Sequence, residues 1–256
     1  MGRRAQDSGA LVVDRRPVVI AHRTCPLDAP ENSLAGIALA SRCGADVVEL
    51  DVRLTLDGVA VCCHDAVPWR TLRWPFPVRA TPASLLALPR ASGWPGRLPT
   101  LRFADALCAL GDDLTVAVDV KVPAAMAVVV AELEAAGLLG RSWLWCRDPA
   151  TIRGLADSHP NVTTALLSRS RTEAAALTYL DMAVAARASA VSLDEISTTP
   201  RVVAAGHDAG LVVHSWVEDP SGHAKALLAG VDGIVTDWPR ECRQLLCAQR
   251  DGSGPT

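Results

Sequence analysis

Residues 47–65 read VVELDVRLTLDGVAVCCHD, two apolar runs separated by Asp57-Gly58. Side chains at positions i and i+2 of a strand share a face, so Glu49 and Asp51 point the same way from a segment rich in Val and Leu. Two carboxylates on one buried face are costly unless a cation lies between them. If Asp57-Gly58 closes a hairpin, register counting pairs Asp51 with His64. The stretch therefore predicts a strand, a returning arm, and a site suited to metal binding and proton transfer.

Short apolar runs alternate with helical segments through the rest of the chain. Eight of these runs are candidate barrel strands, at residues 17–21, 47–51, 114–120, 142–146, 162–167, 190–194, 211–216 and 232–237. Apolar strands that alternate with helices indicate a parallel sheet covered on both faces. Eight such units in 256 residues favour a single-domain α/β fold, a closed (β/α)8 barrel of the TIM type, over an open doubly wound sheet. Residues 59–64 remain as the returning arm of the hairpin.

The chain is expected to form one domain with short extensions. Residues 1–16 are predicted to be a flexible lead-in, residues 17–249 the barrel, and residues 250–256 a disordered tail. Residues 66–99 contain many prolines and are predicted to be a short insertion without long regular elements. Helices are expected at 32–43, 100–110, 123–136, 149–158, 173–187, 200–209, 220–228 and 239–248. Asn32 and Ser33 are expected to cap the first of these helices.

Composition and charge indicate which kinds of partner the protein binds and in which compartment it lies. The formal net charge is −3, which argues against general nucleic-acid binding and favours small-molecule partners. No apolar run has the length of a membrane span, and the first residues lack the apolar core of a secretory signal. The eight cysteines contain no CxxC pair and are expected to be reduced. The sequence therefore predicts a cytoplasmic protein without a zinc cluster.

Polar residues collect at the C-terminal ends of the predicted strands, which is where a parallel barrel places its site. These strand-end residues are His22 and Arg23, Glu49 and Asp51, Asp119 and Lys121, and later Ser215, Trp216 and Asp237. Together with His64 from the hairpin arm, the early ones supply two histidines, three acids and two cations. Trp216 is open to two interpretations, barrel packing or substrate stacking, and Asp237 is expected to be a structural anchor. The set fits metal-assisted phosphoryl chemistry.

Each type of residue has a physical reason to be present in such a site. Three carboxylates, Glu49, Asp51 and Asp119, suit a hard divalent cation such as Mg²⁺ or Ca²⁺ better than zinc. Two cations, Arg23 and Lys121, can offset the negative charge of a phosphodiester, which grows in the transition state. Two histidines, His22 and His64, can act as general acid and base near neutral pH. In a metal-free alternative, Glu49 is a buried ion-pair partner of Arg23 or Lys121.

The pattern AHR…APENS…GADVVELDVRLTLDGVAVCCHD, densest over residues 18–65, closely resembles the glycerophosphodiester phosphodiesterase family. The resemblance continues through DVK at residues 119–121, the strand-end Trp216, and GVDGIVTDWP at residues 230–239. It therefore spans most of the chain. It implies a TIM-barrel phosphodiesterase with a divalent metal that cleaves a glycerophosphodiester into glycerol 3-phosphate and an alcohol.

The resemblance also implies roles for individual residues. By position, His22 and His64 resemble the family's acid/base pair, Arg23 and Lys121 its phosphate-binding cations, Glu49 and Asp51 its metal ligands, and Trp216 a residue of the glycerol pocket. In such enzymes a free glycerol hydroxyl is thought to attack phosphorus first, giving a cyclic phosphate that water then opens.

Three departures from the family pattern keep alternatives open. The residue after the His-Arg pair is Thr24 where the family usually has Gly, and the third metal ligand is Asp119 where Glu is common. The insertion at residues 66–99 is short, which is expected to leave an open site. One alternative is cleavage of a phospholipid head group, as in the related sphingomyelinase D and lysophospholipase D enzymes. Another is a catalytically silent binding barrel.

Overall fold

The computed structural model describes residues 16–87 and 99–250 and contains a closed parallel barrel. The barrel strands are β1 (Val18–Ala21), β2 (Val47–Leu54), β4 (Thr115–Val120), β5 (Ser142–Cys146), β6 (Thr163–Leu167), β7 (Ala190–Asp194), β8 (Val212–Val217) and β9 (Gly233–Thr236). Each pairs in parallel with its neighbours, and β1 closes the ring by pairing with both β2 and β9. The predicted single-domain (β/α)8 barrel is confirmed.

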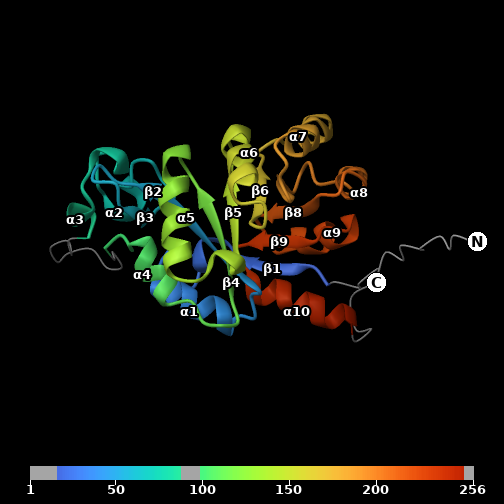
Figure 1. Ribbon diagram of the computed structural model, residues 1–256. Coiled ribbons are helices and arrows are strands. Elements are labelled where there is room, and N and C mark those ends of the chain that lie inside the picture. Colours follow the sequence, from blue (N-terminus) through green and yellow to red (C-terminus); the bar gives the residue numbers. More distant parts are fainter. Residues whose placement is uncertain (1–15, 88–98, 251–256) are drawn as a thin grey trace, which may run out of the picture.

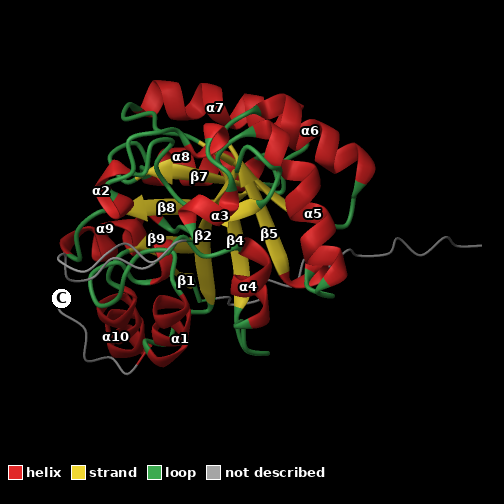
Figure 2. Ribbon diagram, turned by 90° about the vertical axis from the view of Figure 1, so that its left-hand side faces the viewer, coloured by secondary structure: helices red, strands yellow, loops and turns green. Residues whose placement is uncertain are grey.

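Helices surround the strands on the outside of the barrel (Figures 1 and 2). The main helices are α1 (Leu34–Arg42), α4 (Phe103–Cys108), α5 (Met126–Ala135), α6 (Pro149–Ser158), α7 (Glu173–Ala185), α8 (Pro200–Asp208), α9 (Ser221–Ala229) and α10 (Pro239–Arg250). Capping side chains explain where several of them begin, because Asp148, Thr172 and Thr199 each accept a hydrogen bond from a backbone N–H in the first turn. Proline at the first position of α6 and α8 reinforces these starts.

The hairpin after β2 has a different register from the expected one. The returning strand β3 (Ala60–Cys62) pairs Val52 with Cys62, and the N–H of Cys63 donates to the carbonyl of Asp51 at 2.8 Å. The predicted pairing of Asp51 with His64 is therefore wrong by one residue. The reason is a three-residue turn over residues 56–58 that ends with Gly58 in the left-handed region, at φ 76°. His64 consequently lies beyond the end of β3, where its carbonyl accepts hydrogen bonds from Arg53.

The proline-rich segment after His64 contains only short elements in its described part. These are α2 (Trp69–Leu72), a 3₁₀ turn at Val78–Ala80, and α3 (Ala83–Leu86). Other 3₁₀ turns are at His22–Thr24, Pro123–Ala125 and Leu139–Arg141. The short elements pack Leu72, Val78 and Leu86 against the β3 arm. Residues 88–98, most of the predicted lead-in and the end of the predicted tail lie outside the described residues, so those domain boundaries stay predictions.

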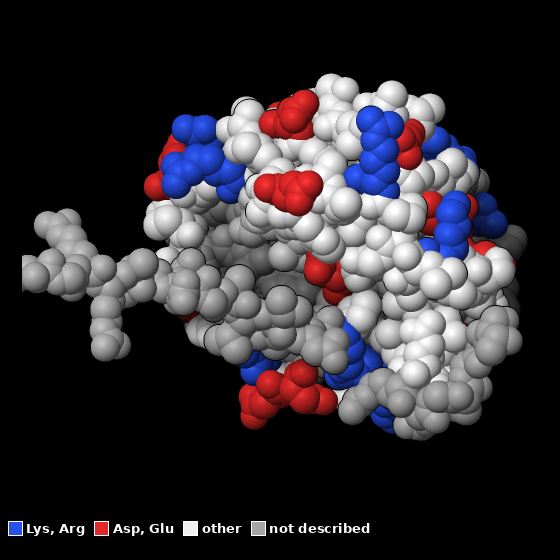
Figure 3. Space-filling model, turned by 90° about the vertical axis from the view of Figure 1, so that its right-hand side faces the viewer, with Lys and Arg blue, Asp and Glu red and all other residues white. Residues whose placement is uncertain are grey.

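The outer surface carries charges of both signs. Figure 3 shows one face on which Lys and Arg side chains are interspersed with Asp and Glu, and neither kind forms an extended patch on the described part of that face. No helix in the described ranges is long and apolar enough to cross a membrane.

The barrel interior holds a small core and one buried histidine. Its apolar residues are Ile20, Val47, Ala117, Trp145, Ala165, Leu167, Ala190 and Val235. His214 on β8 stacks on Trp143 with ring centroids 5.2 Å apart, and burial lowers its pKa to about 4. Gly233 makes room for this ring, because a Cβ at position 233 would lie 2.8 Å from His214 Cδ2. The folded protein therefore holds His214 neutral well below the ordinary pKa of histidine.

We expect His214 to make the fold sensitive to acid. Below its ordinary pKa the unfolded chain binds a proton that the folded chain excludes down to about pH 4, so the free energy of unfolding should fall as pH falls through this window, by roughly 3 kcal/mol from this residue. His214→Gln should flatten the decline, whereas His207→Gln, at an exposed histidine, should not. Urea unfolding across this pH range measures both slopes, and an unchanged slope in His214→Gln would contradict the assignment.

Candidate active site

The loop after β1 places the first two site residues through an unusual backbone. Arg23, Thr24 and Cys25 all have positive φ, at 44°, 64° and 65°. This conformation turns the N–H of Arg23 toward Glu49, to which it donates at 2.7 Å. Thr24 is fully buried, its Oγ1 accepts from the N–H of Ser33 at 3.2 Å, and it does not line the cavity described below. The residue that replaces the family's usual Gly therefore packs beneath the site.

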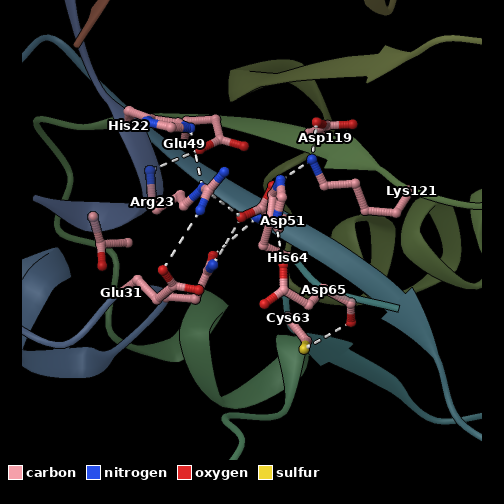
Figure 4. Close-up of polar contacts among 12 residues, drawn as sticks. His22, Arg23, Glu31, Glu49, Asp51, Cys63, His64, Asp65, Asp119 and Lys121 are labelled. Carbon is pink, nitrogen blue, oxygen red and sulfur yellow. Dashed lines mark hydrogen bonds and ion pairs between the residues drawn. The ribbon is translucent and has the colours of Figure 1, made fainter. Parts of the chain in front are cut away.

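Three carboxylates form a buried cluster at the centre of the site (Figure 4). Glu49 and Asp51 share a face of β2, and Asp119 lies opposite Asp51 on β4. One oxygen from each lies within 4.8 Å of the others, and the three residues are 0%, 0% and 1% exposed. The shorter Asp119 side chain reaches the other two. The structure thus brings together the three residues that the sequence identified as candidate metal ligands.

Two cations compensate part of this negative charge. Lys121 Nζ contacts Asp51 Oδ1 at 2.6 Å and also contacts Asp119 Oδ2, while Arg23 Nε lies 3.5 Å from Asp51 Oδ2. Burial would raise the pKa of Asp51, but Lys121 and Arg23 outweigh it and hold that pKa well below its usual range. Burial likewise opposes the charge of Lys121, but Asp51 and Asp119 raise its pKa. The lysine is therefore charged and locked between two carboxylates.

The same cluster has the chemistry of a divalent cation site. Burial and the neighbouring Asp51 raise the pKa of Glu49 well above its usual value, and Glu49 Oε1 has no hydrogen-bond partner within the described part of the chain. A carboxylate oxygen in that state is stabilised by a further positive charge nearby. Three acidic oxygens without sulfur or imidazole match the preference of hard cations such as Mg²⁺ or Ca²⁺. The residues present fit such an ion.

Each site histidine has one ring nitrogen fixed by an acid. His22 Nδ1 lies 2.6 Å from Asp237 Oδ1, and His64 Nδ1 lies 2.7 Å from Asp65 Oδ1. Arg23 Nε donates to His22 Nε2 at 3.1 Å, so Nε2 is unprotonated and Nδ1 carries the proton. This arrangement leaves Nε2 of each ring as the atom that can exchange protons. Burial lowers the pKa of His64, although Asp51 and Asp65 oppose that shift.

Several residues around the histidines and acids were missed as site residues. Asp65 and Asp237 orient the imidazoles, although the sequence predicted only an anchoring role for Asp237. Glu31 accepts two hydrogen bonds from Arg70, at 2.7 Å each, and lies 3.5 Å from Arg23. Only its position in the APENS motif could have indicated Glu31. The contacts of Asp237 with His22 and of Glu31 with Arg70 join residues distant in sequence, so local patterns do not reveal them. The contact between the neighbours His64 and Asp65 depends on the orientation of their side chains, which the sequence pattern does not show.

Asn32 has a role that differs from the expected one. Its Nδ2 donates to Asp51 Oδ2 and its Oδ1 accepts from the N–H of Asp51, both at 2.9 Å. The helix α1 is capped by Ser33 alone, whose Oγ accepts from the N–H of Gly36. The prediction that Asn32 takes part in the cap is therefore wrong. Asparagine suits the position because its φ is 54°, a left-handed conformation that Asn tolerates better than most residues.

The histidines and cations open into one cavity of about 660 Å³. Its lining includes His22, His64, Arg23, Lys121 and Trp216, so five of the eight predicted site residues face it, while the three acids lie buried beneath. Trp216 packs edge-on against His22, with centroids 4.7 Å apart. A second cavity, of about 760 Å³, lies between the β1–α1 loop and the insertion and is lined by none of the eight.

Comparison with known proteins gives consistent matches. The model of the glycerophosphoryl diester phosphodiesterase family matches residues 22–241. Glycerophosphodiester phosphodiesterase 1 of Bos taurus is 35% identical over 167 residues, 60% of this chain and 50% of that protein. The chain thus spans half the length of that relative. A crystal structure of glycerophosphodiester phosphodiesterase from Agrobacterium tumefaciens has a TM-score of 0.74 and 25% identity, covering 90% of this chain and 100% of the other.

A further solved structure supports the fold. An Oleispira antarctica phosphodiesterase in complex with the product sn-glycerol-3-phosphate has a TM-score of 0.79 at 21% identity, covering 89% of this chain and 96% of the other. At that identity the likeness concerns the barrel itself.

The Asn32–Asp51 contact should contribute strongly to stability. Asn32→Ala removes one hydrogen bond to the buried Asp51 carboxylate and one from the Asp51 backbone N–H, and it places Ala at a positive φ, so we expect a loss of roughly 2–4 kcal/mol in the free energy of unfolding. The neighbouring Ser33→Ala removes an N-cap and should cost about 1 kcal/mol. Urea unfolding of both variants compares them. A smaller loss for Asn32→Ala than for Ser33→Ala would contradict this account.

Proposed function

Because the chain belongs to the glycerophosphoryl diester phosphodiesterase family, we propose that it hydrolyses a glycerophosphodiester to glycerol 3-phosphate and an alcohol. The observation that carries the proposal is the convergence, at one end of the barrel, of two carboxylate-oriented histidines with the buried cluster of three acids. The sn-glycerol-3-phosphate in the Oleispira structure is a product of this reaction class, which supports the proposed substrate.

The two histidines would divide the proton transfers between them. Hydrolysis forms a bond from an incoming oxygen to phosphorus and breaks the bond from phosphorus to the alcohol oxygen. One imidazole Nε2 removes the proton of the attacking hydroxyl, and the other returns a proton to the departing alcohol. The attacking hydroxyl is either water or the free hydroxyl of the glycerol, in which case a cyclic phosphate is the first product. Asp65 and Asp237 stabilise each ring when it becomes charged.

The acids and cations would handle the negative charge. Glu49, Asp51 and Asp119 are the residues that would hold a divalent cation, Mg²⁺ or Ca²⁺, which when bound would polarise a phosphoryl oxygen. Arg23 and Lys121 line the cavity beside the cluster, where they can offset the charge that grows on the phosphoryl oxygens. Trp216 would offer its ring to the glycerol carbons. The edge-on contact with His22 holds the Trp216 ring at the end of the cavity where the histidines lie.

A second candidate function is cleavage of a phospholipid head group. Four apolar side chains on the β1–α1 loop and the insertion are 40–58% exposed: Leu27, Val67, Trp69 and Phe76. Exposed apolar groups of this kind favour contact with a lipid.

A cytoplasmic location stays a prediction, supported by the absence of disulfides among the eight cysteines.

Both histidines should be required for turnover. We expect His22→Ala and His64→Ala each to lower the rate of glycerol 3-phosphate release from glycerophosphocholine by at least about 100-fold, since each removes a proton-transfer group. His207→Ala, at an exposed histidine outside the cavity, should retain the parent rate. Thermal melting would verify folding. Parent rates in both variants would rule out the acid/base assignment, and release of a head group from lysophosphatidylcholine alone would favour the second function.

The three acids should control metal binding as well as activity. After chelation with EDTA and dialysis, we expect the protein to bind Mg²⁺ or Ca²⁺ in calorimetry, and Glu49→Gln or Asp119→Asn to weaken binding by at least about tenfold, because each removes a charged ligand. Glu173→Gln, which makes the same charge change on α7, is the control. Full turnover by metal-stripped protein would contradict the metal role, whatever the binding results.

A further inference from the structure

Within the described residues, two arginines on the wall of the cavity lack the ion pairs that its other arginine and lysine side chains form. Arg147 follows β5 and Arg169 follows β6, and both line the same cavity as the histidines. Among the described residues, neither forms an ion pair within 4.0 Å or a side-chain hydrogen bond. By contrast, Arg23 and Lys121 contact carboxylates, and Arg171 on the same wall lies 3.7 Å from Asp194.

The two arginines follow neighbouring strands, because β5 and β6 pair with Cys146 opposite Leu166. Arg169 has a lowered pKa because of partial burial and then the nearby charge of Arg147. The loop that carries Arg169 is fixed, since Ser170 N–H donates to Ser168 Oγ at 3.0 Å and Ser168 N–H donates to the carbonyl of Ser192 at 2.9 Å. Two positive side chains on one cavity wall, with no carboxylate within 4.0 Å of either among the described residues, favour the binding of an anion there.

The register of the strands places this pair above the acid cluster. Asp119 lies beside Trp145, and Trp145 lies beside Ala165. Arg147 is two residues beyond Trp145, and Arg169 is four residues beyond Ala165, so both lie nearer the mouth of the barrel than Asp119 does. The scissile phosphate belongs beside the acid cluster with Arg23 and Lys121. A second anionic group farther out along the substrate is the partner that Arg147 and Arg169 can reach.

The acids that line the same cavity are Asp194, Glu218 and Asp237, at or just beyond the ends of β7, β8 and β9. Asp237 contacts His22 and Asp194 lies 3.7 Å from Arg171, so among the described residues Glu218 is the only one of these acids without an ion-pair partner. The unengaged charge of the cavity is therefore mainly positive and lies on the β5–β6 side.

We propose that Arg147 and Arg169 bind an anionic group, a carboxylate or a phosphate, on the alcohol portion of the substrate. This inference rests on the proposed function and assigns its substrate class: glycerophosphodiesters whose leaving alcohol is itself negatively charged. The arginines act in substrate selection, since their guanidinium groups are paired with the alcohol and the bond that breaks lies deeper in the cavity.

The test compares substrates that differ by one anionic group. Glycerophosphoserine and glycerophosphoethanolamine differ only by a carboxylate, and glycerophosphoinositol 4-phosphate and glycerophosphoinositol differ only by a phosphate. Binding is measured by calorimetry on the His22→Ala protein, so it does not require turnover. We expect the anionic member of at least one pair to bind about five- to tenfold more tightly, and the pair that shows this identifies the anion.

Variants then assign the preference to the two arginines. In the His22→Ala background, Arg147→Gln with Arg169→Gln should bring the affinity ratio close to one, while Arg201→Gln, an equal loss of charge outside the cavity, should leave it unchanged. Equal affinity within both pairs, or a ratio that survives the double substitution, would overturn the inference. Selective binding without turnover by the parent enzyme would overturn the proposed hydrolysis and leave the anion subsite standing.

Discussion

The burial of three carboxylates within 4.8 Å of one another is the constraint on which the site depends. Each neighbouring element supplies something that makes this burial tolerable. The strand β4 brings Lys121, the loop after β1 brings Arg23 and its backbone N–H, and the segment before α1 brings the amide of Asn32. Ring closure by the β1–β2 pairing brings these segments to the same place. The closure of the barrel is therefore also what brings the compensating groups to the buried acids.

The fold could be predicted well from the sequence, because its signal is carried by residue type. Eight apolar runs separated by helical segments leave few alternatives to a parallel barrel. The hairpin register could not be predicted in the same way. Whether the turn contains two or three residues depends on the backbone of Gly58, and a change of one residue moves His64 out of the ladder. Counting residues along the sequence does not predict the backbone dihedral angles of Gly58, so it does not predict the register.

The candidate site, like the fold, has one part that residue type predicts and another that only the three-dimensional arrangement reveals. Residues that place a charge within an apolar strand, such as Glu49 and Asp119, were identified because a charge in an apolar run is conspicuous. Asn32 was missed because it is an ordinary loop residue until the fold brings it against Asp51. Asp65 was missed because its contact with the neighbouring His64 depends on side-chain orientation. Arg147 and Arg169 were missed for a related reason. An arginine without a partner becomes informative only when its surroundings are known.

The hydrogen bond from Arg23 Nε to His22 Nε2 occupies the lone pair with which this nitrogen could otherwise accept a proton. That nitrogen cannot accept from the guanidinium and take up a substrate proton at the same time. In the proposed reaction, an arriving phosphodiester would offer Arg23 a stronger acceptor than a neutral ring, and the arginine would release the imidazole in turning to it. His22 would then become available to take up a proton only once the substrate is bound.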